Sequence, residues 1–150
     1  EILERDIQFN KIVGVANGAF SDAKFTATYG TRVDGLYDIN YRYNPNSLES
    51  QELLQAYYET YGEEIPVAAI YGYESVMVLA DALQRAEDDS TEALRSALQA
   101  TNMENHVLPQ GAIEFDETGE NIRSAGVLIE IQNGKQVIVF PEEYAEENNE

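Results

Sequence analysis

Cysteine is absent from the sequence, and histidine occurs once among its 150 residues. The absence of thiols excludes disulfide bridges, thiolate metal sites and cysteine nucleophiles. The single imidazole, His106, cannot form a histidine-rich metal centre, and we expect neither a metal site nor a cofactor. His106 lies in a polar stretch without the neighbours of a nucleophilic site, so we predict that it is a surface residue.

Long apolar runs are also missing, because none approaches the roughly 20 residues that a membrane-spanning helix requires. The first ten residues, EILERDIQFN, contain no basic region followed by an apolar core, which argues against a signal peptide. They begin with helix-forming residues and without an initiator methionine. We therefore interpret the chain as a segment of a longer protein.

Positive charge is scarce: the chain has 28 acidic and 9 basic residues, and its formal net charge is −19. Nucleic acids and anionic membranes are poor partners for such a chain, because both are bound through lysine and arginine. The acidic residues are distributed throughout the sequence and not confined to a tail. This pattern favours a halophilic protein, and a mildly acidic protein of a mesophile is the alternative.

The halophilic interpretation predicts how stability responds to salt. Repulsion among so many carboxylates destabilises a compact state at low ionic strength, and salt screens this repulsion. The free energy of unfolding, measured by urea titration, is therefore expected to rise as KCl is raised to multimolar concentrations. A steady fall with KCl would contradict the interpretation.

The clearest periodic pattern lies between Ile70 and Ala86, where apolar residues recur at spacings of three and four. This spacing predicts an amphipathic helix of about four turns. Its apolar stripe consists of Tyr73, Val76, Met77, Leu79, Ala80 and Leu83. In front of it, Pro66–Gly72 is a short run of small and β-prone residues that predicts a strand. Strand, loop and amphipathic helix are the repeating unit of an α/β layer fold.

Further elements follow from turn and capping signals on either side of this unit. Before it, the sequence predicts a buried strand at Lys11–Ala16, a turn at Asn17-Gly18, a helix capped by Ser21 or Asp22 that runs to Tyr29, a strand at Leu36–Asn40, and a helix that is capped by Asn46 or Ser47 and that Gly62 ends. After it, the sequence predicts a helix with a capping box of Asp89 and Glu92, strands at Ala112–Phe115, Ala125–Ile131 and Gln136–Phe140, a hairpin turn at Asn133-Gly134, and a solvated tail beyond Pro141. The predicted fold class is α/β.

Five segments, in order and with plausible gaps, resemble one known family. They are GVANGAFSDAKF with Val33-Asp34-Gly35, then Asn44-Pro45, AYYETYG, YGYESVMVLADAL and GAIEFDETGEN. The family is that of the type I periplasmic (extracellular) solute-binding proteins of ABC transporters, in the branch that binds leucine, isoleucine and valine. The resemblance extends from about Lys11 to Pro141.

The resemblance implies a fold of two α/β lobes, joined by three crossover strands, that close on a solute. Residues 1–39 and 125–150 would belong to the second lobe, which ends in the predicted hairpin. Residues 40–124 would belong to the first lobe and include crossover segments. The chain would correspond to the C-terminal half of the family fold, and the missing N-terminal half of the same protein would be its structural partner.

The implied function is that of an extracellular or periplasmic receptor, anchored to the membrane in the full-length protein. It would bind an amino acid, an amide or a related small polar solute and deliver it to an ABC permease after hinge closure. A ligand-sensing ectodomain on the same fold is the alternative. No enzymatic activity is expected, since the sequence has no glycine-rich phosphate loop and no Gly-x-Ser-x-Gly motif.

Candidate solute contacts lie at two predicted strand ends, because ligands of open α/β sheets bind beyond the carboxyl ends of the strands. The first end comprises Asn17, Gly18, Ala19 and Phe20. In the family, an acidic or polar group in this loop binds the ammonium of the solute. Asn17 can accept a hydrogen bond there but carries no charge, and the role of a plain turn residue is equally open to it. Phe20 either lines the cleft or covers the sheet.

The second predicted strand end supplies Ala68 and Tyr71. The family places a residue near Ala68 against the solute side chain, where alanine leaves room for a bulky solute. Tyr71 or Tyr73 offers a ring and a hydroxyl. Packing in the core or on the helix surface is the favoured interpretation for Tyr73.

Calcium binding is an alternative interpretation of Asp116, Thr118 and Glu120, which surround Gly119. The EF-hand pattern needs more oxygen ligands at fixed steps and a glutamate at its twelfth position, and these are absent. We therefore predict a β-turn between strands at this place.

Overall fold

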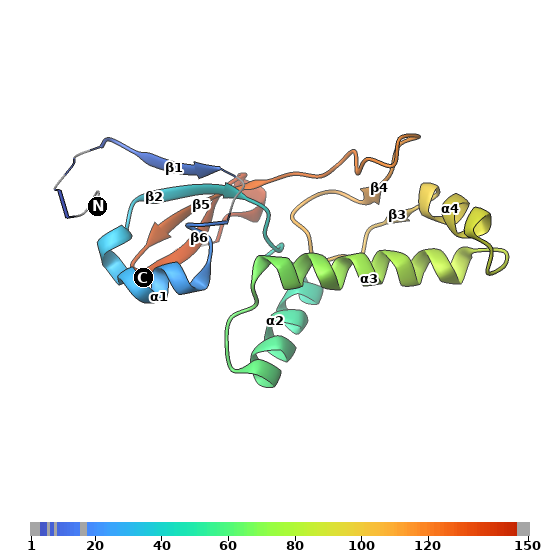
Figure 1. The fold of residues 1–150 in the computed structure, drawn as a ribbon, viewed down its shortest axis with the longest axis horizontal. Coiled ribbons are helices and arrows are strands. Elements are labelled where there is room, and N and C mark those ends of the chain that lie inside the picture. Colours follow the sequence, from blue (N-terminus) through green and yellow to red (C-terminus); the bar gives the residue numbers. More distant parts are fainter. Residues whose placement is uncertain (1–3, 6, 8, 16–17, 147–150) are drawn as a thin grey trace. The chain divides into compact units, whose positions relative to one another are not determined.

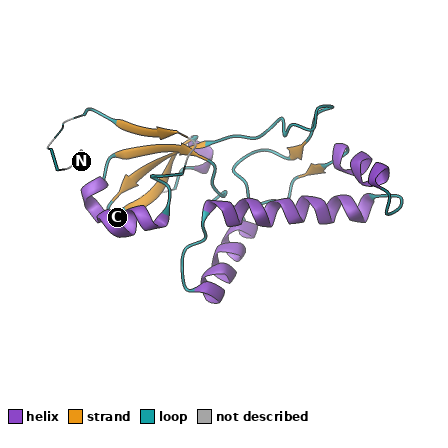
Figure 2. Cartoon of the chain, in the orientation of Figure 1, coloured by secondary structure: helices purple, strands orange, loops and turns teal. Residues whose placement is uncertain are grey.

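The computed structural model describes residues 4–5, 7, 9–15 and 18–146. The chain divides into two compact units, which we call unit 1 (Glu1–Asn40 and Val127–Glu150) and unit 2 (Tyr41–Gly126). Figure 1 shows the elements of both units along the chain, and Figure 2 shows that helices and short strands make up unit 2. Among the described residues, no helix combines the length and the apolarity that crossing a membrane requires.

Unit 1 is built on a four-stranded mixed sheet with the strand order β1-β2-β5-β6. Its first two strands, β1 (Ile12–Val15) and β2 (Leu36–Asn40), are parallel. They are connected through α1 (Ala23–Tyr29) and the 3-10 helix η1 (Gly30–Val33). Two further strands, β5 (Val127–Gln132) and β6 (Lys135–Phe140), continue the sheet in antiparallel fashion. The four strands and the helix predicted for these segments are confirmed.

The core of unit 1 lies on one face of β5 and β6. Val127, Ile129 and Ile131 alternate with more exposed residues along β5, and each is 1% exposed. Ile138 of β6 is fully buried beside them. The hairpin turn between the two strands has positive φ angles at Asn133 (53°) and Gly134 (72°), which is the type I′ geometry that the Asn-Gly pair predicts.

The segment after β6 returns to the sheet, so the prediction of a solvated tail beyond Pro141 is wrong for its first residues. The 3-10 helix η2 (Glu142–Tyr144) places Tyr144 against the cluster of Val127, Ile129 and Ile138. The backbone N–H of Glu146 then donates to the carbonyl of Ile138 at 3.0 Å. An aromatic ring gains more from covering the apolar cluster than from exposure to water. The predicted tail residues 147–150 lie outside the described residues.

Unit 2 contains three helices: α2 (Leu48–Tyr61), α3 (Val67–Arg85) and α4 (Thr91–Gln99). The predicted ends of α2 are confirmed, because the Ser47 hydroxyl accepts from the N–H of Ser50 at 3.1 Å and Gly62 closes the helix in the left-handed conformation. The capping box predicted for α4 is wrong by one residue. Asp88 accepts from the N–H of Ser90, and the Ser90 hydroxyl caps the helix in place of Asp89.

The strand predicted at Pro66–Gly72 does not form, and this prediction is wrong. The segment is the first part of α3, with Pro66 as its N-cap. Proline suits the start of a helix, since the N–H that it lacks would have no partner inside the helix. Val67 and two alanines follow, and the helical period then continues without a break through the buried residues Ile70, Glu74, Val78 and Ala82.

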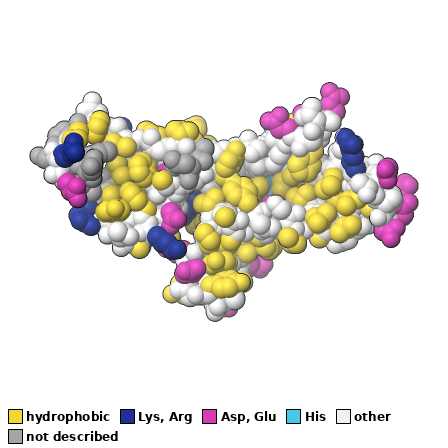
Figure 3. Space-filling view, viewed as in Figure 1, with side chains coloured by type: hydrophobic (Ala, Val, Ile, Leu, Met, Phe, Trp, Pro, Cys, Tyr) yellow, Lys and Arg dark blue, Asp and Glu magenta, His cyan; other side chains and the backbone are white. Residues whose placement is uncertain are grey.

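The apolar stripe predicted for this helix is largely exposed within the chain. Val76 is 64% and Leu83 54% exposed, and Tyr73, Met77 and Leu79 are exposed as well. Figure 3 shows apolar side chains gathered over α3 and, below it, over α2. The residues that α3 buries within unit 2 lie on another face, spaced by four. Unit 2 therefore buries one face of α3, which includes Glu74, and leaves a second, apolar face exposed.

The prediction that His106 is a surface residue is wrong, because only 8% of it is exposed. Its Nδ1 accepts from the N–H of Leu108 at 3.1 Å, and its Nε2 lies 2.9 Å from the carbonyl oxygen of Gly111. With Nδ1 as an acceptor, the proton belongs on Nε2. His106 thereby closes its own loop, a contact within five residues that composition alone does not indicate.

Two short strands, β3 (Asn102–Met103) and β4 (Ile113–Glu114), pair in antiparallel fashion on unit 2. The sequence predicts β4 but not the two-residue β3. Beyond β4, the predicted β-turn is confirmed: the N–H of Gly119 donates to the carbonyl of Asp116 at 3.0 Å. Oδ1 of Asp116 also accepts from the N–H groups of Thr118 and Glu120.

Candidate functional site

The loop between β1 and α1 follows the carboxyl end of β1. Because β1 and β2 are parallel, their carboxyl ends meet at the same edge of the sheet, where ligands of α/β folds bind. Ala19 is exposed at this edge, and Gly18 has a φ angle of +71° that favours glycine. Asn17 lies outside the described residues. Phe20 is half-buried, and its ring centroid is 5.2 Å from that of Phe25 on α1.

Three polar side chains lie behind this loop and form a network that the sequence analysis missed. Oδ2 of Asp38 accepts from the N–H of Ser21 at 3.1 Å and from the Ser21 hydroxyl. Nδ2 of Asn40 donates to the same hydroxyl oxygen at 2.9 Å. Ser21, Asp38 and Asn40 are 5%, 1% and 7% exposed. Asp38 and Asn40 alternate on the inward face of β2, and polar residues at inward positions are the signal that could have revealed them.

Gly14 of β1 makes room for this network. Gly14 is the strand partner of Asp38. A Cβ atom at this position would lie 2.8 Å from Oδ1 of Asp38 and 2.9 Å from Cδ2 of Phe20. These separations are too short for a side chain, so the close approach requires glycine. The carboxylate and the Phe20 ring therefore share the space above Gly14.

In unit 2, the predicted contacts Ala68 and Tyr71 lie on the first turns of α3 and not at the end of a strand. Ala68 is exposed, and Tyr71 is half-buried. The rings of Tyr71 and Tyr41 meet edge to face, with centroids 5.5 Å apart. The Tyr71 hydroxyl is buried without a hydrogen-bond partner, and burial, followed by the proximity of Tyr41, raises the pKa of Tyr71.

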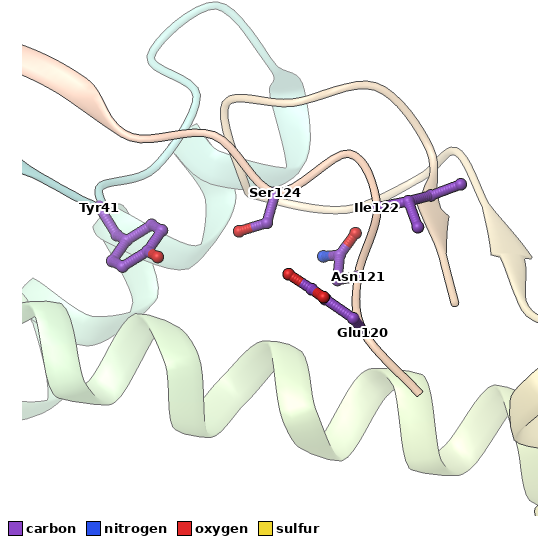
Figure 4. Close-up of a pocket in the computed structure, with 5 residues that line it drawn as sticks. All are labelled: Tyr41, Glu120, Asn121, Ile122 and Ser124. Atoms are coloured by element: carbon purple, nitrogen blue, oxygen red, sulfur yellow. The ribbon is translucent and has the colours of Figure 1, made fainter. Parts of the chain in front are cut away.

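Tyr41 also lines an open pocket of unit 2 with a volume of about 580 Å³. Its other lining residues are Glu120, Asn121, Ile122 and Ser124. Figure 4 shows Ser124 pointing toward Tyr41, whereas Ile122 points away from it. The amide of Asn121 is held by the side chain of Gln110, with a donor–acceptor distance of 3.3 Å. The pocket therefore offers hydroxyl, amide and carboxylate groups to a small polar molecule. No pattern in the sequence indicated its position.

In the part of the chain that the structure describes, no cluster of three or more His, Asp or Glu residues is placed to hold a metal ion. The alternative calcium residues instead form the turn described above. The Thr118 hydroxyl donates to Oδ1 of Asp116 at 2.7 Å. This bond, followed by the N–H of Glu120, lowers the pKa of Asp116. The Asp116 carboxylate thus stabilises the turn by itself.

Comparison with known proteins relates the chain to one family. The sequence profile of the family described as "Periplasmic binding protein" matches residues 2–136. A curated relative, the "Leu/Ile/Val-binding protein homolog 7" of Brucella abortus (strain 2308), is 25% identical over 137 residues, which are 87% of this chain and 34% of that protein. The chain therefore spans about a third of the length of this relative.

Solved structures of similar proteins give the same result for the fold. A leucine binding protein from Thermotoga maritima MSB8 matches with a TM-score of 0.69 and 25% identity, over 90% of this chain and 38% of that one. A substrate-binding protein of an ABC transporter from Desulfitobacterium hafniense, solved in complex with Leu, matches with a TM-score of 0.68 and 22% identity, over 92% and 38%.

The profile match covers most of the chain, and both solved structures contain its α/β arrangement as part of a longer fold. The resemblance noted in the sequence is thus confirmed at the level of the family, which consists of binding proteins and not of enzymes. The chain belongs to the periplasmic binding protein family.

Proposed function

We propose that this chain is part of an extracellular solute receptor that binds a branched-chain amino acid such as leucine and delivers it to an ABC permease. The observation that carries the proposal is the family membership, together with the names of the relatives that are 25% identical. One is a Leu/Ile/Val-binding protein homolog and the other a leucine binding protein. The family name supports a periplasmic or extracellular location.

Unit 1 is proposed to be part of the second lobe of this receptor, and unit 2 part of the first lobe. The division of the chain at Asn40–Tyr41 and Gly126–Val127 supports this assignment, because it lies close to the crossovers that the resemblance implies. In the complete receptor, a solute that contacts both lobes would stabilise the closed state by its difference in affinity for the two states.

The rest of the receptor is proposed to cover the exposed apolar stripe of α3. Apolar surface of this kind is normally buried against another element. The edge strand β1 also exposes apolar side chains, since Val13 is 48% and Val15 64% exposed. The rest of the receptor is proposed to cover these residues as well. The matched solved structures have the additional chain length that such a cover needs, since this chain spans only 38% of them.

The solute contacts are proposed to come from the loop of unit 1 and the start of α3 in unit 2. The loop position of Asn17, Gly18, Ala19 and Phe20 beyond a parallel strand pair supports the first set. For Ala68 and Tyr71, the support is the exposed alanine and the half-buried tyrosine ring on the first turns of α3. A branched aliphatic side chain suits the space that Ala68 leaves.

The test is a thermal melt with and without leucine, performed on the 150-residue chain and on the longer polypeptide that contains it. The longer polypeptide is expected to melt cooperatively, and leucine at 100 times its Kd is expected to stabilise it by about 2.7 kcal/mol. The chain alone is expected to melt broadly and to ignore leucine, because the apolar stripe of α3 and the edge strand β1 then lack the cover that the rest of the receptor is proposed to provide.

Isocaproate, which has the leucine side chain but lacks the ammonium group, is the matched control solute. A longer polypeptide that ignores leucine but is stabilised by another amide or amino acid would overturn the proposed solute. Failure of every such solute to raise the melting temperature would overturn the receptor function. A leucine-dependent melt of the chain alone would show that it holds a working site without a further half.

A further inference from the structure

The carboxylate of Asp38 occupies an unusual place in the sheet of unit 1. Asp38 lies between Gly14 of β1 and Ile129 of β5, and 1% of it is exposed. A buried carboxylate is costly unless hydrogen bonds compensate for the water that it has lost. An apolar residue at such a position would stabilise the strand more than a carboxylate does. The presence of Asp38 therefore calls for a role beyond packing.

The hydrogen bonds to this carboxylate come from a single residue of the loop beyond β1. The N–H and the hydroxyl of Ser21 both donate to Oδ2, whereas Oδ1 is buried without a partner. Asn40 supports the same point, since its amide donates to the Ser21 hydroxyl oxygen at 2.9 Å. Charge-assisted bonds are about twice as strong as neutral ones. The loop is thus tied to the centre of the sheet at Ser21.

This attachment lies next to the residues proposed to meet the solute. Ser21 directly follows Ala19 and Phe20, and Asp22 then caps α1 by accepting from the N–H of Lys24 at 2.8 Å. The Phe20 ring lies over Gly14 beside the Asp38 carboxylate. Between β1 and α1, the loop is therefore fixed at its last residues, immediately after Phe20.

We propose that Asp38 is a positioning residue: through Ser21 it sets the conformation of the loop Gly18–Asp22, and thereby the affinity for the solute. Only the second part of this inference, the effect on solute affinity, rests on the proposed function. Asp38 itself does not touch the solute, because the sheet and Phe20 bury it. A loop without this attachment samples more conformations, and the apparent affinity falls with the fraction that is competent to bind.

Amide hydrogen exchange, followed by NMR in multimolar KCl on the longer polypeptide that contains this chain, tests the first half of the proposal. Asp38→Asn keeps the size of the side chain and one acceptor oxygen but removes the charge. It is expected to speed exchange of the Ser21 amide about tenfold, while the amides of β5 and β6 keep their protection. Ser21→Ala, which removes only the hydroxyl, is expected to have a smaller effect at the same amide.

Asp34→Asn is the matched control. Asp34 is also a carboxylate of unit 1 that accepts from a backbone N–H of another segment, that of Gly134 at 2.8 Å. It is expected to speed exchange at Gly134 and to leave Ser21 unchanged. An unprotected Ser21 amide in the unmodified polypeptide, with β5 and β6 protected, would overturn the proposal. So would equal acceleration by Asp38→Asn and Asp34→Asn, or a uniform loss of protection across the sheet.

Leucine titration of the longer polypeptide tests the second half. Asp38→Asn is expected to raise the Kd for leucine about fivefold with little change in melting temperature, and Asp34→Asn is expected to leave the Kd unchanged. Equal Kd values in all three proteins would overturn the link to affinity. If the unmodified polypeptide does not bind leucine, the proposed solute fails, and the exchange of the Ser21 amide still decides the positioning role.

Discussion

Replacing Ile138 by alanine is expected to lower the free energy of unfolding of unit 1 by about 2 to 5 kcal/mol. Ile138 is fully buried, and it packs with Val127 and Ile129 under the ring of Tyr144. The substitution removes three carbon atoms from the centre of this cluster and leaves a cavity that the rigid sheet cannot fill by moving. A loss at the upper end of this range is at least a third of the roughly 5 to 15 kcal/mol that typically stabilises a domain.

The measurement is urea unfolding of the longer polypeptide, followed by the NMR cross-peaks of β5 and β6, which report on unit 1 alone. Ile39→Ala is the matched control, because it is the same change at a residue of β2 that is 43% exposed. It is expected to cost well below half as much, about 1 kcal/mol or less. Equal losses in the two variants would show that the cluster of Val127, Ile129 and Ile138 is not the core of the unit.

The second large effect is expected at Glu74, a carboxylate of α3 that is 4% exposed. Its Oε2 accepts from the buried N–H of Val107 at 2.9 Å, and its Oε1 has no partner. The carbonyl of Val107 accepts in turn from the N–H of Asn44 at 2.7 Å and from the Ser50 hydroxyl at 3.2 Å. Val107 thus connects α3 with α2 and with the segment that precedes α2.

Glu74→Ala is expected to destabilise unit 2 by about 2 kcal/mol, because it leaves the Val107 N–H buried without an acceptor. Glu74→Gln retains an acceptor oxygen of the same reach and is expected to keep most of the stability. The two variants are compared by urea unfolding, followed by the NMR cross-peaks of α3. Equal losses in both would show that the Val107 hydrogen bond is not what Glu74 contributes.

Glu74 also makes the stability of unit 2 depend on pH. Burial raises the pKa of this carboxyl above its ordinary value of 4.5, and the Val107 N–H and His106 act in the opposite direction more weakly. Between pH 4.5 and the raised pKa, the Glu74 carboxyl therefore holds a proton in the folded chain that it has already released in the unfolded chain. This contribution to stability is fully present below about pH 4.5 and is lost as the pH rises through the raised pKa.

The pH dependence is isolated by subtracting the free energy of unfolding of Glu74→Gln from that of the unmodified chain between pH 4 and 8. The unmodified chain is expected to lose stability relative to Glu74→Gln as the pH rises. Subtraction is necessary because Glu130 has a lowered pKa, mainly through the Tyr37 hydroxyl, and acts in the opposite sense. Glu52→Gln, a change at an exposed residue of α2, is expected to give a flat difference.

The features that were predictable from the sequence depend on short segments. The Asn133-Gly134 turn, the caps of α2 and the Asp116 turn involve residues within about four positions of one another, so local patterns suffice. The wrong prediction at Pro66–Gly72 shows the limit of such patterns. A run of small residues suits both a strand and the first turn of a helix, and the helical stripe of Ile70 and Glu74 decides between them.

The candidate site was predictable only in part, for the same reason. The turn after β1 marks the position of the loop, but the residue that holds it is 17 positions further along the chain. Asp38 reaches Ser21 because β2 pairs in register with β1, and that register depends on the whole sheet. Likewise, Glu74 reads as an ordinary polar residue until the fold brings it to Val107, 33 positions further along the chain.

The interrupted path of the chain through unit 1 has a consequence for its biosynthesis. The hydroxyl of Tyr37 on β2 bonds to Glu130 on β5, a residue 93 positions later. Unit 2 is contiguous between these strands, so a ribosome completes it before β5 and β6 exist. During that interval, the β1–β2 pair and its buried Asp38 stand without the remaining strands. Contacts of such sequence separation form slowly, and nascent chains of this protein are expected to depend on holding chaperones until the last hairpin has emerged.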